Sequence, residues 1–407
     1  MHEWVDSVGK SRHGLFCRGL FNAMKVLMLN ERDLDHPFAG GVEVHLDELS
    51  RCLFARHGIE TTVLCSAYEG ARPDETKGGV RYVRSGGKFS YYAQLPSRVR
   101  SHWRTGEYDL VVENLCKLLF FSQVYLPGVP RLALVHHLFG LSAFRQVPAP
   151  IATYVAFSEA LLPIFYRRWP FVVVSPSTRD DLKKRFLPGK RIRVIPNGLD
   201  HDRFRLDPSV PVERGLVLFV GRLEYYKGVD VLLRAWRQVI RQRPDARLVL
   251  VGAGSAAESL RARLTEKREQ ASVSFQGFVS ESEKIDWLRR AEVLVQPSHK
   301  EGWGLTVLEA NACGTPVVAT RVPGLQDSVR HEKSGLLVPP SDSTALAGAL
   351  SRILGDSKER QVLSQGGLEW AEHFSWGAVA DAFAGVLGAV ARREELPEQS
   401  NFSHLLG

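Results

Sequence analysis

Short apolar runs alternate with amphipathic helical stretches along nearly the whole chain, and this alternation restricts the possible folds more than any other feature. Strands that alternate with helices are typical of parallel sheets whose faces are covered by helices. The predicted strands are Val26–Leu29, Thr62–Leu64, Leu110–Val112, Leu132–Val135, Val172–Val174, Arg191–Ile195, Leu216–Val220, Arg247–Val251, Val273–Phe275, Val293–Val295, Val317–Ala319 and Gly335–Val338. The sequence therefore predicts the α/β class.

The alternation occurs twice, on either side of a linker from Asp200 to Arg214 that contains Pro208 and Pro211. A chain of 407 residues also exceeds the ~250–300 residues at which single cores stop growing. We expect two Rossmann-like parallel-sheet domains that face an interdomain cleft. The expected segments are an N-terminal extension at 1–23, an acceptor domain at 24–205, a donor domain at 206–375, a helix at 376–391 that crosses back to the first domain, and a polar tail at 392–407.

Three helices are predicted directly from apolar periodicity and end signals. One runs from Val42 to His57 with apolar residues on one face and is ended by Gly58. The others are Asp230–Arg243 and Trp376–Ala391.

Composition indicates a soluble globular protein with reduced thiols. No run reaches the ~18 apolar residues of a spanning helix, and residues 1–23 lack the apolar region of a secretory signal. The five cysteines lack the spacing of a metal site and fit reduced cytosolic thiols. We therefore expect a cytoplasmic protein.

The positive charge is confined to the first half of the chain. Through Arg214 there are 30 lysines and arginines against 22 acidic residues, whereas the remainder balances at 23 against 23. This asymmetry suggests an anionic acceptor or an anionic membrane surface, with scattered solvated side chains as the alternative. No recognition helix or aromatic-basic module indicates nucleic acid as a partner.

The segment from Glu301 to Glu309, with sequence EGWGLTVLE, is the most informative motif. It lies between two predicted strands, so we expect Glu301 in a loop and Glu309 on a short helix that begins near Gly304. A helix N-terminus suits a phosphate, and two acids beside it suit sugar hydroxyls. This arrangement suggests a nucleotide-sugar pocket, although capping and solvation also explain acids near a helix start.

Two cations follow the first strand of the second half, in the loop Gly221–Gly228. Ligands of open parallel sheets bind beyond the carboxyl ends of strands, so Arg222 and Lys227 are placed to hold a diphosphate. The alternative is a charged loop whose two side chains face solvent.

Three further candidates lie at strand ends. Gly254, in GAGSAA, matches the dinucleotide fingerprint, but no acid follows ~20 residues later, so we do not expect a nicotinamide site. The segment is either a loop against a base or ribose or a plain strand-to-helix turn. Gly40 and Gly41 open a helix and let the backbone approach a ligand, or simply form a tight turn. His136 ends a strand and is placed to hydrogen-bond a sugar hydroxyl or serve a structural role.

Two Asp-x-Asp triplets, Asp33–Asp35 and Asp200–Asp202, match the pattern that holds a divalent ion on a diphosphate. Such triplets are common by chance, and Arg222 with Lys227 already supplies positive charge. We expect no metal and no cofactor.

Together these motifs make the chain resemble a retaining glycosyltransferase of family four, with the GT-B fold. The resemblance extends from Gly40-Gly41-Val42-Glu43 to Phe374-Ser375-Trp376. Its most specific part is the Glu301–Glu309 motif with the following ANACGTPVV.

The resemblance implies a role for each candidate residue. Arg222 and Lys227 would hold the donor diphosphate, Glu309 would accept from the ribose hydroxyls, and Glu301 would contact the transferred sugar. Backbone N–H groups of Gly304, Leu305 and Thr306 would complete the phosphate site, with Gly41 facing it from the first domain. His136 matches the family's active-site histidine, while His137 departs from the usual Asp or Gly and leaves the acceptor open.

The expected function is transfer of a hexose from a UDP- or GDP-sugar to a saccharide or lipid-linked glycan, with retention and without a metal. The alternatives are a nucleotide-sugar 2-epimerase of the same architecture and a non-catalytic GT-B-like subunit. Ala152–Trp169, with Phe157, Leu161, Leu162, Phe165, Tyr166, Arg167 and Arg168, suggests peripheral attachment to the inner membrane face, with core packing as the rival explanation.

Overall fold

The computed structural model describes residues 24–87, 90–115, 119–140, 144, 148–398 and 402. The predicted N-terminal extension at 1–23 lies outside the described residues, as do Cys17 and Cys116. The described chain divides into two compact units. The first contains the residues up to Asn114, Phe120–Leu132 and Ala380–Pro397, and the second contains Leu115, Leu119, Ala133–Val379 and the residues after Pro397.

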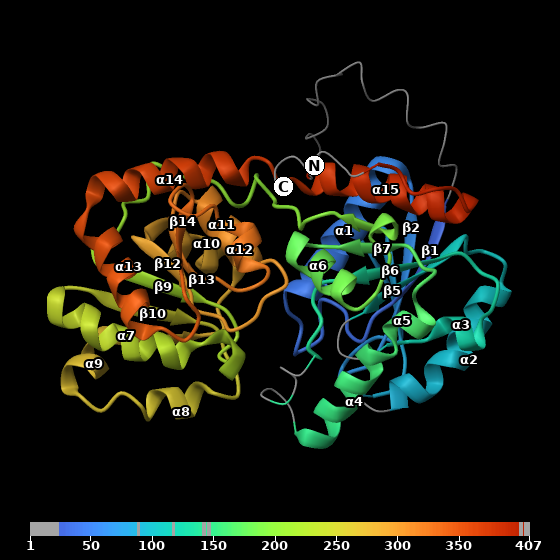
Figure 1. Cartoon of the computed structure of the whole chain (residues 1–407), viewed down its shortest axis with the longest axis horizontal. Coiled ribbons are helices and arrows are strands. Elements are labelled where there is room, and N and C mark those ends of the chain that lie inside the picture. Colours follow the sequence, from blue (N-terminus) through green and yellow to red (C-terminus); the bar gives the residue numbers. More distant parts are fainter. Residues whose placement is uncertain are drawn as a thin grey trace, which may run out of the picture. The chain divides into compact units, whose positions relative to one another are not determined.

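Two sheets form among the described residues, and each is built mainly from parallel strands (Figure 1). The larger has eight strands in the described parts of the chain, in the order β3-β4-β2-β1-β5-β6-β7-β8. Its strands are β1 Lys25–Leu29, β2 Glu60–Cys65, β3 Asp74–Lys77, β4 Val80–Arg84, β5 Leu110–Leu115, β6 Arg131–Val135, β7 Phe171–Val173 and β8 Ile192–Val194. Only β3 is antiparallel among the pairings described, and it pairs with β4 at the sheet edge.

The second sheet has six strands within the described residues, in the order β11-β10-β9-β12-β13-β14. Its strands are β9 Leu216–Val220, β10 Arg247–Val251, β11 Val273–Gly277, β12 Val293–Gln296, β13 Val317–Thr320 and β14 Gly335–Val338. All its described pairings are parallel. Parallel strands covered on both faces are continuously apolar, and β9, with the sequence LVLFV, is buried along its whole length.

Helices follow the strands in chain order, as the alternation predicts. Those of the first half are α1 Gly41–His57, α2 Ser90–Arg104, α3 Ser122–Tyr125, α4 Ala149–Ala160, α5 Leu162–Phe165 and α6 Pro176–Lys184. Those of the second half are α7 Val229–Gln242, α8 Ala257–Arg261, α9 Lys267–Ser272, α10 Glu281–Arg290, α11 Leu305–Ala312, α12 Leu325–Ser328, α13 Ser343–Gly355, α14 Ser357–Ala371 and α15 Trp376–Arg392. The predicted α/β class with two parallel-sheet units is therefore confirmed.

The core of the second sheet forms around α7 and α13, which pack against each other beside the strands. Trp236 on α7 is almost fully buried in this core, together with Phe219 on β9. Burial of one large apolar side chain contributes about 1.5–3 kcal/mol, so such residues hold the strand ends that carry the loops described below.

The last helix divides between the two units. Ala380–Pro397 belongs to the first unit, where Asp381 pairs with Arg56 at 2.7 Å and with His57 at 2.8 Å. Counted as one stretch, Ser357–Arg392 is long and apolar enough to cross a membrane. That is weak support for a span, because 61% of its apolar window is buried and core helices pass the same test.

Candidate active site

The loop after β9 brings Arg222, Tyr226 and Lys227 together. Tyr226 and Lys227 belong to a 3-10 turn, Tyr225–Lys227, that ends at Gly228 with φ 67°. A Cβ at Gly228 would lie 2.1 Å from the carbonyl oxygen of Pro297, so the turn requires glycine for both space and conformation. The Arg222 guanidinium donates to the Tyr226 hydroxyl at 2.9 Å, and Lys227 Nζ lies 5.3 Å from the centre of the Tyr226 ring.

Lys227 forms an ion pair with Glu301, which lies in the loop between β12 and α11. Glu301 also accepts a hydrogen bond from Ser298 Oγ at 2.8 Å. Burial on its own would lower the pKa of Lys227, but Glu301 and Tyr226 raise that pKa above its ordinary value. The lysine is therefore charged at neutral pH. Two residues that sequence analysis nominated separately are in direct contact.

Helix α11 begins four residues beyond Glu301, at Leu305. Its N-cap is Gly304, with φ 93°, and no side chain caps this end. The N–H groups of Gly304, Leu305 and Thr306 belong to this first turn, where an α-helix has no intrahelical acceptors for them. A positive helix end thus begins close to the Lys227–Glu301 pair.

Glu309 lies on α11 and is buried. Its carboxylate pairs with Lys284 of α10 at 3.0 Å, and Lys284 Nζ lies 4.7 Å from the centre of the Phe204 ring. Glu309, which is predicted to accept hydrogen bonds from the ribose, therefore has a lysine partner in the structure, as Glu301 has in Lys227.

Gly254 lies in the loop after β10, directly against the loop that carries Arg222. A Cβ at position 254 would lie 2.3 Å from the carbonyl oxygen of Leu223, which only glycine avoids. The neighbouring Ser255 donates to Glu224 through its backbone N–H at 3.1 Å and its hydroxyl at 2.7 Å. The contact joins the loops after β9 and β10 at one end of the sheet.

His136 follows β6 and is buried. Its carbonyl oxygen would lie 2.8 Å from a Cβ at Gly302, so the backbone at His136 touches the residue after Glu301. Burial, and to a smaller extent His137, lowers the pKa of His136 to about 3. The imidazole is therefore neutral at physiological pH and can both donate and accept a hydrogen bond.

Gly41 begins α1 in the first unit, immediately after the N-cap Gly40. The N–H of Gly40 donates to Glu43 Oε2 at 2.7 Å, which is one half of a capping box. The two glycines thus form the helix start that the sequence predicted.

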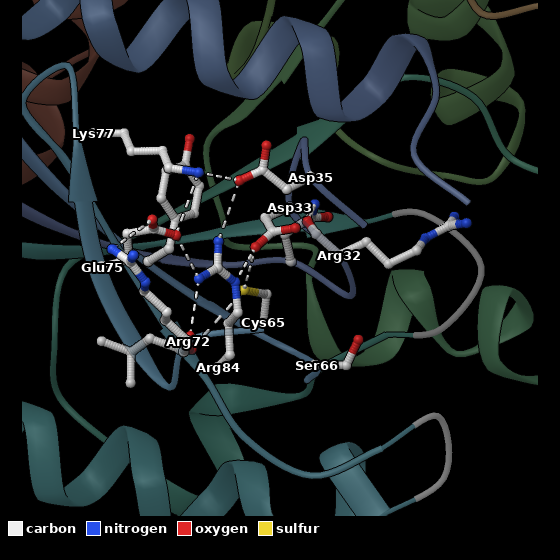
Figure 2. Close-up of polar contacts among 12 residues, drawn as sticks. Arg32, Asp33, Asp35, Cys65, Ser66, Arg72, Glu75, Lys77 and Arg84 are labelled. Atoms are coloured by element: carbon white, nitrogen blue, oxygen red, sulfur yellow. Dashed lines mark hydrogen bonds and ion pairs between the residues drawn. The ribbon is translucent and has the colours of Figure 1, made fainter. Parts of the chain in front are cut away.

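Three aspartates of the two Asp-x-Asp triplets, Asp33, Asp35 and Asp200, have cationic or amide partners. Asp33 pairs with Arg84, and Asp35 pairs with Lys77 at 2.5 Å (Figure 2). Asp200 pairs with Arg203 at 2.6 Å and accepts from the N–H of Asp202 at 3.0 Å. Within the described residues no cluster of three or more His, Cys, Asp and Glu side chains is arranged for a metal ion.

Two family models match the chain in succession. Residues 39–203 match the Glycosyltransferase Family 4 model, and residues 200–370 match the model of glycosyl transferases group 1. A D-inositol 3-phosphate glycosyltransferase from Thermobispora bispora is 30% identical over 406 residues, covering 90% of this chain and 94% of the relative. The chain belongs to the group 1 glycosyltransferases. It is therefore an enzyme that transfers a sugar.

Solved structures show the same fold. A sucrose-phosphate synthase from Thermosynechococcus elongatus matches with a TM-score of 0.76 at 24% identity, covering 89% of this chain and 97% of that one. Anabaena HepE, solved with UDP and glucose, matches with a TM-score of 0.73 at 20% identity, covering 90% of this chain and all of the other. The GT-B architecture expected from the sequence is confirmed.

Sequence reasoning missed the residues that hold this glycosyltransferase's candidate site in shape. These are Tyr226 between the two cations, Ser298 on Glu301, and Lys284 on Glu309. Tyr226 lies inside the nominated loop and was within reach of the motif. Lys284 lies on a different helix, 25 positions from its partner, and no local pattern connects the two.

Proposed function

We propose that this enzyme transfers a hexose from a UDP- or GDP-sugar to a saccharide or lipid-linked glycan, with retention and without a metal. The observation that carries the proposal is the contact between Lys227 and Glu301, which lies four residues before the first residue of α11. It supports one pocket that offers cations and helix N–H groups to phosphate and a carboxylate to sugar hydroxyls.

The donor diphosphate would lie against Arg222, Lys227 and the N–H groups of Gly304, Leu305 and Thr306. As the anomeric bond breaks, negative charge develops on the departing phosphate, and these fixed groups would stabilise it where it appears. Lys227 has a carboxylate partner before the donor binds. The phosphate would take over part of that interaction and leave Glu301 available to a sugar hydroxyl.

Glu309 would accept from the ribose hydroxyls, and Gly254 would let the backbone approach the nucleoside. The close contact of Gly254 with Leu223 supports this role, because it holds the loop after β10 against the loop that carries Arg222. The name of the 30%-identical relative, an inositol phosphate glycosyltransferase, supports a polyhydroxylated acceptor.

Retention would follow from front-face substitution. The departing phosphate oxygen would take the proton of the acceptor hydroxyl, while the neutral imidazole of His136 hydrogen-bonds the transferred sugar. Its lowered pKa supports this role, since an imidazolium would repel the positive charge that develops at the anomeric carbon.

Metal independence is supported by how the charges are arranged. Arg222 and Lys227 supply the positive charge that a divalent ion would bring to a diphosphate. The carboxylates of Asp33 and Asp35 are engaged by Arg84 and Lys77 and are not assembled as a ligand set.

Peripheral membrane attachment at the cytoplasmic face is a further part of the proposal, supported by α4 and α5. Phe157 and Ile164 expose 62% and 71% of their surface, and Arg167 and Arg168 beside them are exposed. Apolar side chains beside arginines suit an anionic lipid surface. Leu162, Tyr166 and Trp169, by contrast, are buried, so core packing accounts for those three.

A titration with UDP and GDP, followed by a donor assay, tests the function. We expect one nucleotide at about 100 times its Kd to stabilise the protein by roughly 2.7 kcal/mol, seen as a higher melting temperature. Release of that nucleotide from its sugar should then depend on an added acceptor, which distinguishes transfer from 2-epimerisation. If neither nucleotide moves the melting temperature, the donor assignment is wrong.

A further inference from the structure

Arg84, at the end of β4, is the centre of a buried ion network in the first unit (Figure 2). Its side chain is 1% exposed and pairs with Asp33, which is 2% exposed. It also contacts Glu75 at 2.9 Å and Asp35 at 3.6 Å, and Asp35 in turn pairs with Lys77 at 2.5 Å. Removing one partner of such a buried pair leaves an uncompensated buried charge, so the network holds the segment after β1 firmly to the β3–β4 hairpin.

The far end of the same segment is fixed by Arg32. Its guanidinium donates to the carbonyl oxygen of Phe38 at 2.6 Å and lies 3.5 Å from the Glu43 carboxylate. Glu43 accepts from the N–H of Gly40 at 2.7 Å. The loop between β1 and α1 is therefore fastened at both ends by charged groups.

The loop between β1 and α1 carries His36 and Phe38, and the segment after β2 carries Tyr68. We call these three residues the aromatic surface. The ring centre of His36 lies 5.8 Å from that of Phe38 and 5.3 Å from that of Tyr68. Phe38 is 69% exposed. The Arg84 guanidinium lies 5.6 Å from the centre of the Tyr68 ring, so one ion network orients both the loop and Tyr68.

The imidazole of His36 is held in one tautomer. The N–H of Phe38 donates to His36 Nδ1 at 3.1 Å, so Nδ1 is the acceptor and Nε2 carries the proton. Burial, then Arg32, lowers the pKa of His36, against the opposing effect of Asp33 and Glu31. The aromatic surface thus includes a neutral ring with an N–H donor at its edge.

We propose that the aromatic surface binds a sugar ring of the acceptor by stacking. This inference rests on the proposed transferase function and names a subsite for its acceptor. Ring faces carry negative charge density and attract the polarised C–H groups on the apolar face of a pyranose or cyclitol. Asp35 and Arg72 are exposed on the two chain segments that carry these rings, and they offer hydrogen bonds to the hydroxyls of such a ligand.

Position and rigidity both favour a ligand over a bare surface. His36 and Phe38 follow β1, and Tyr68 follows β2, so the rings lie beyond the carboxyl ends of two adjacent parallel strands, where open α/β sheets bind ligands. An exposed aromatic ring on a loop fixed by several ion pairs has little conformational entropy left to lose on binding. Such a pre-organised ring is suited to a weakly held sugar.

The test uses the full chain with variants at exposed positions, which leave the core unchanged. Phe38→Ala removes the ring, Phe38→Trp keeps an aromatic face, and Phe186→Ala removes a different ring that is 83% exposed. Saturation-transfer NMR would be run with millimolar methyl α-D-glucopyranoside, methyl α-D-mannopyranoside and myo-inositol as probes. Binding of UDP and GDP would be titrated for each variant in parallel.

We expect at least one probe to receive saturation on its C–H protons from wild type, Phe38→Trp and Phe186→Ala. The signal with Phe38→Ala should be about five-fold weaker than with wild type, since an aromatic contact of this kind is worth roughly 1 kcal/mol. Its nucleotide affinity should not change. An undiminished signal in Phe38→Ala, or no signal from any probe in wild type, would overturn the proposal. If wild type binds neither UDP nor GDP, that result would instead count against the transferase function.

Discussion

At the scale of single residues, both acids of the candidate site are paired with lysines. Glu301 is paired with Lys227, and Glu309 is paired with Lys284. A bound donor must therefore replace part of these ion pairs with its own contacts. Exchange of this kind costs less than exposing a bare buried charge, because each carboxylate keeps a partner until the ligand arrives.

Lys227→Ala should lower kcat/KM for sugar transfer by about 10²–10³-fold, because one group that stabilises the leaving phosphate is gone. We expect a comparable loss from Glu309→Ala through weaker donor binding. The matched control is Arg234→Ala, which breaks an exposed ion pair with Asp230 on α7. Steady-state kinetics with the identified donor measure the effect, and circular dichroism checks that each variant folds. Near wild-type rates in Lys227→Ala would refute the assignment.

His136 should make the protein less stable as the solution is acidified. Its pKa is about 3 when folded and about 6.5 when unfolded, so between these values only the unfolded chain binds the proton. The free energy of unfolding therefore decreases by about 1.4 kcal/mol per pH unit as pH falls from 6.5 towards 3. Calorimetry of His136→Asn from pH 7 to pH 5 should show a melting temperature that declines less steeply than wild type, by about 3 °C per pH unit. Parallel slopes would show that His136 titrates normally.

At the scale of elements, apolar periodicity predicted nearly the whole framework. Every strand named from the sequence is present, with small differences in where it begins or ends. Helix α1 ends at Gly58, in the left-handed conformation that its glycine predicted. These agreements reflect local rules, because strand burial and helix caps depend on neighbouring residues.

The β3–β4 hairpin was missed, although its turn is readable. Gly78 and Gly79 connect the two strands, both with positive φ, and Gly-Gly is a typical two-residue hairpin loop. The β3 sequence DETK is polar and lies at the sheet edge, so it lacks the apolar signal used for the other strands. The ion pairs of Arg84 were also beyond sequence reasoning, because Asp33 is 51 positions away and becomes a neighbour only in the fold.

The start of α11 should be intolerant of a side chain. Gly304→Ala places a Cβ 2.8 Å from Leu325 Cδ2 at φ 93°, so we expect a loss of about 1–3 kcal/mol in stability and weaker nucleotide binding. Gly348→Ala is the matched control, since it lies on the exposed side of α13 with nothing within 4 Å. That change should stabilise the protein by about 0.5–1 kcal/mol. Melting curves with and without nucleotide separate the two effects, and equal behaviour of both variants would contradict the glycine requirement.

At the scale of the whole molecule, charge and apolar exposure coincide in one part of the chain. The formal charge of +8 arises in residues 1–214, and the exposed apolar side chains of α4 and α5 lie in that half. Weak apolar contact or weak electrostatic attraction alone would not hold a protein to a membrane, but the two contributions add.

Flotation with vesicles of mixed anionic and neutral phospholipid tests this attachment. We expect wild type to float at low salt and to be released as salt screens the arginines, over a Debye length of about 10 Å at 0.1 M. The double variant Phe157→Ser with Ile164→Ser should stay unbound, whereas Phe186→Ser should float like wild type. Wild type that remains at the bottom of the gradient at low salt would rule out this attachment.

The path of α15 also bears on how the protein is made. Ala380–Pro397 packs in the first unit, through Asp381 with Arg56 and His57, although the rest of that unit was synthesised more than 240 residues earlier. On the ribosome, the nascent chain carries an incomplete first unit until the final helix emerges from the exit tunnel. The second unit has almost all of its residues before then. We therefore expect the unit translated first to be the one that completes its packing last.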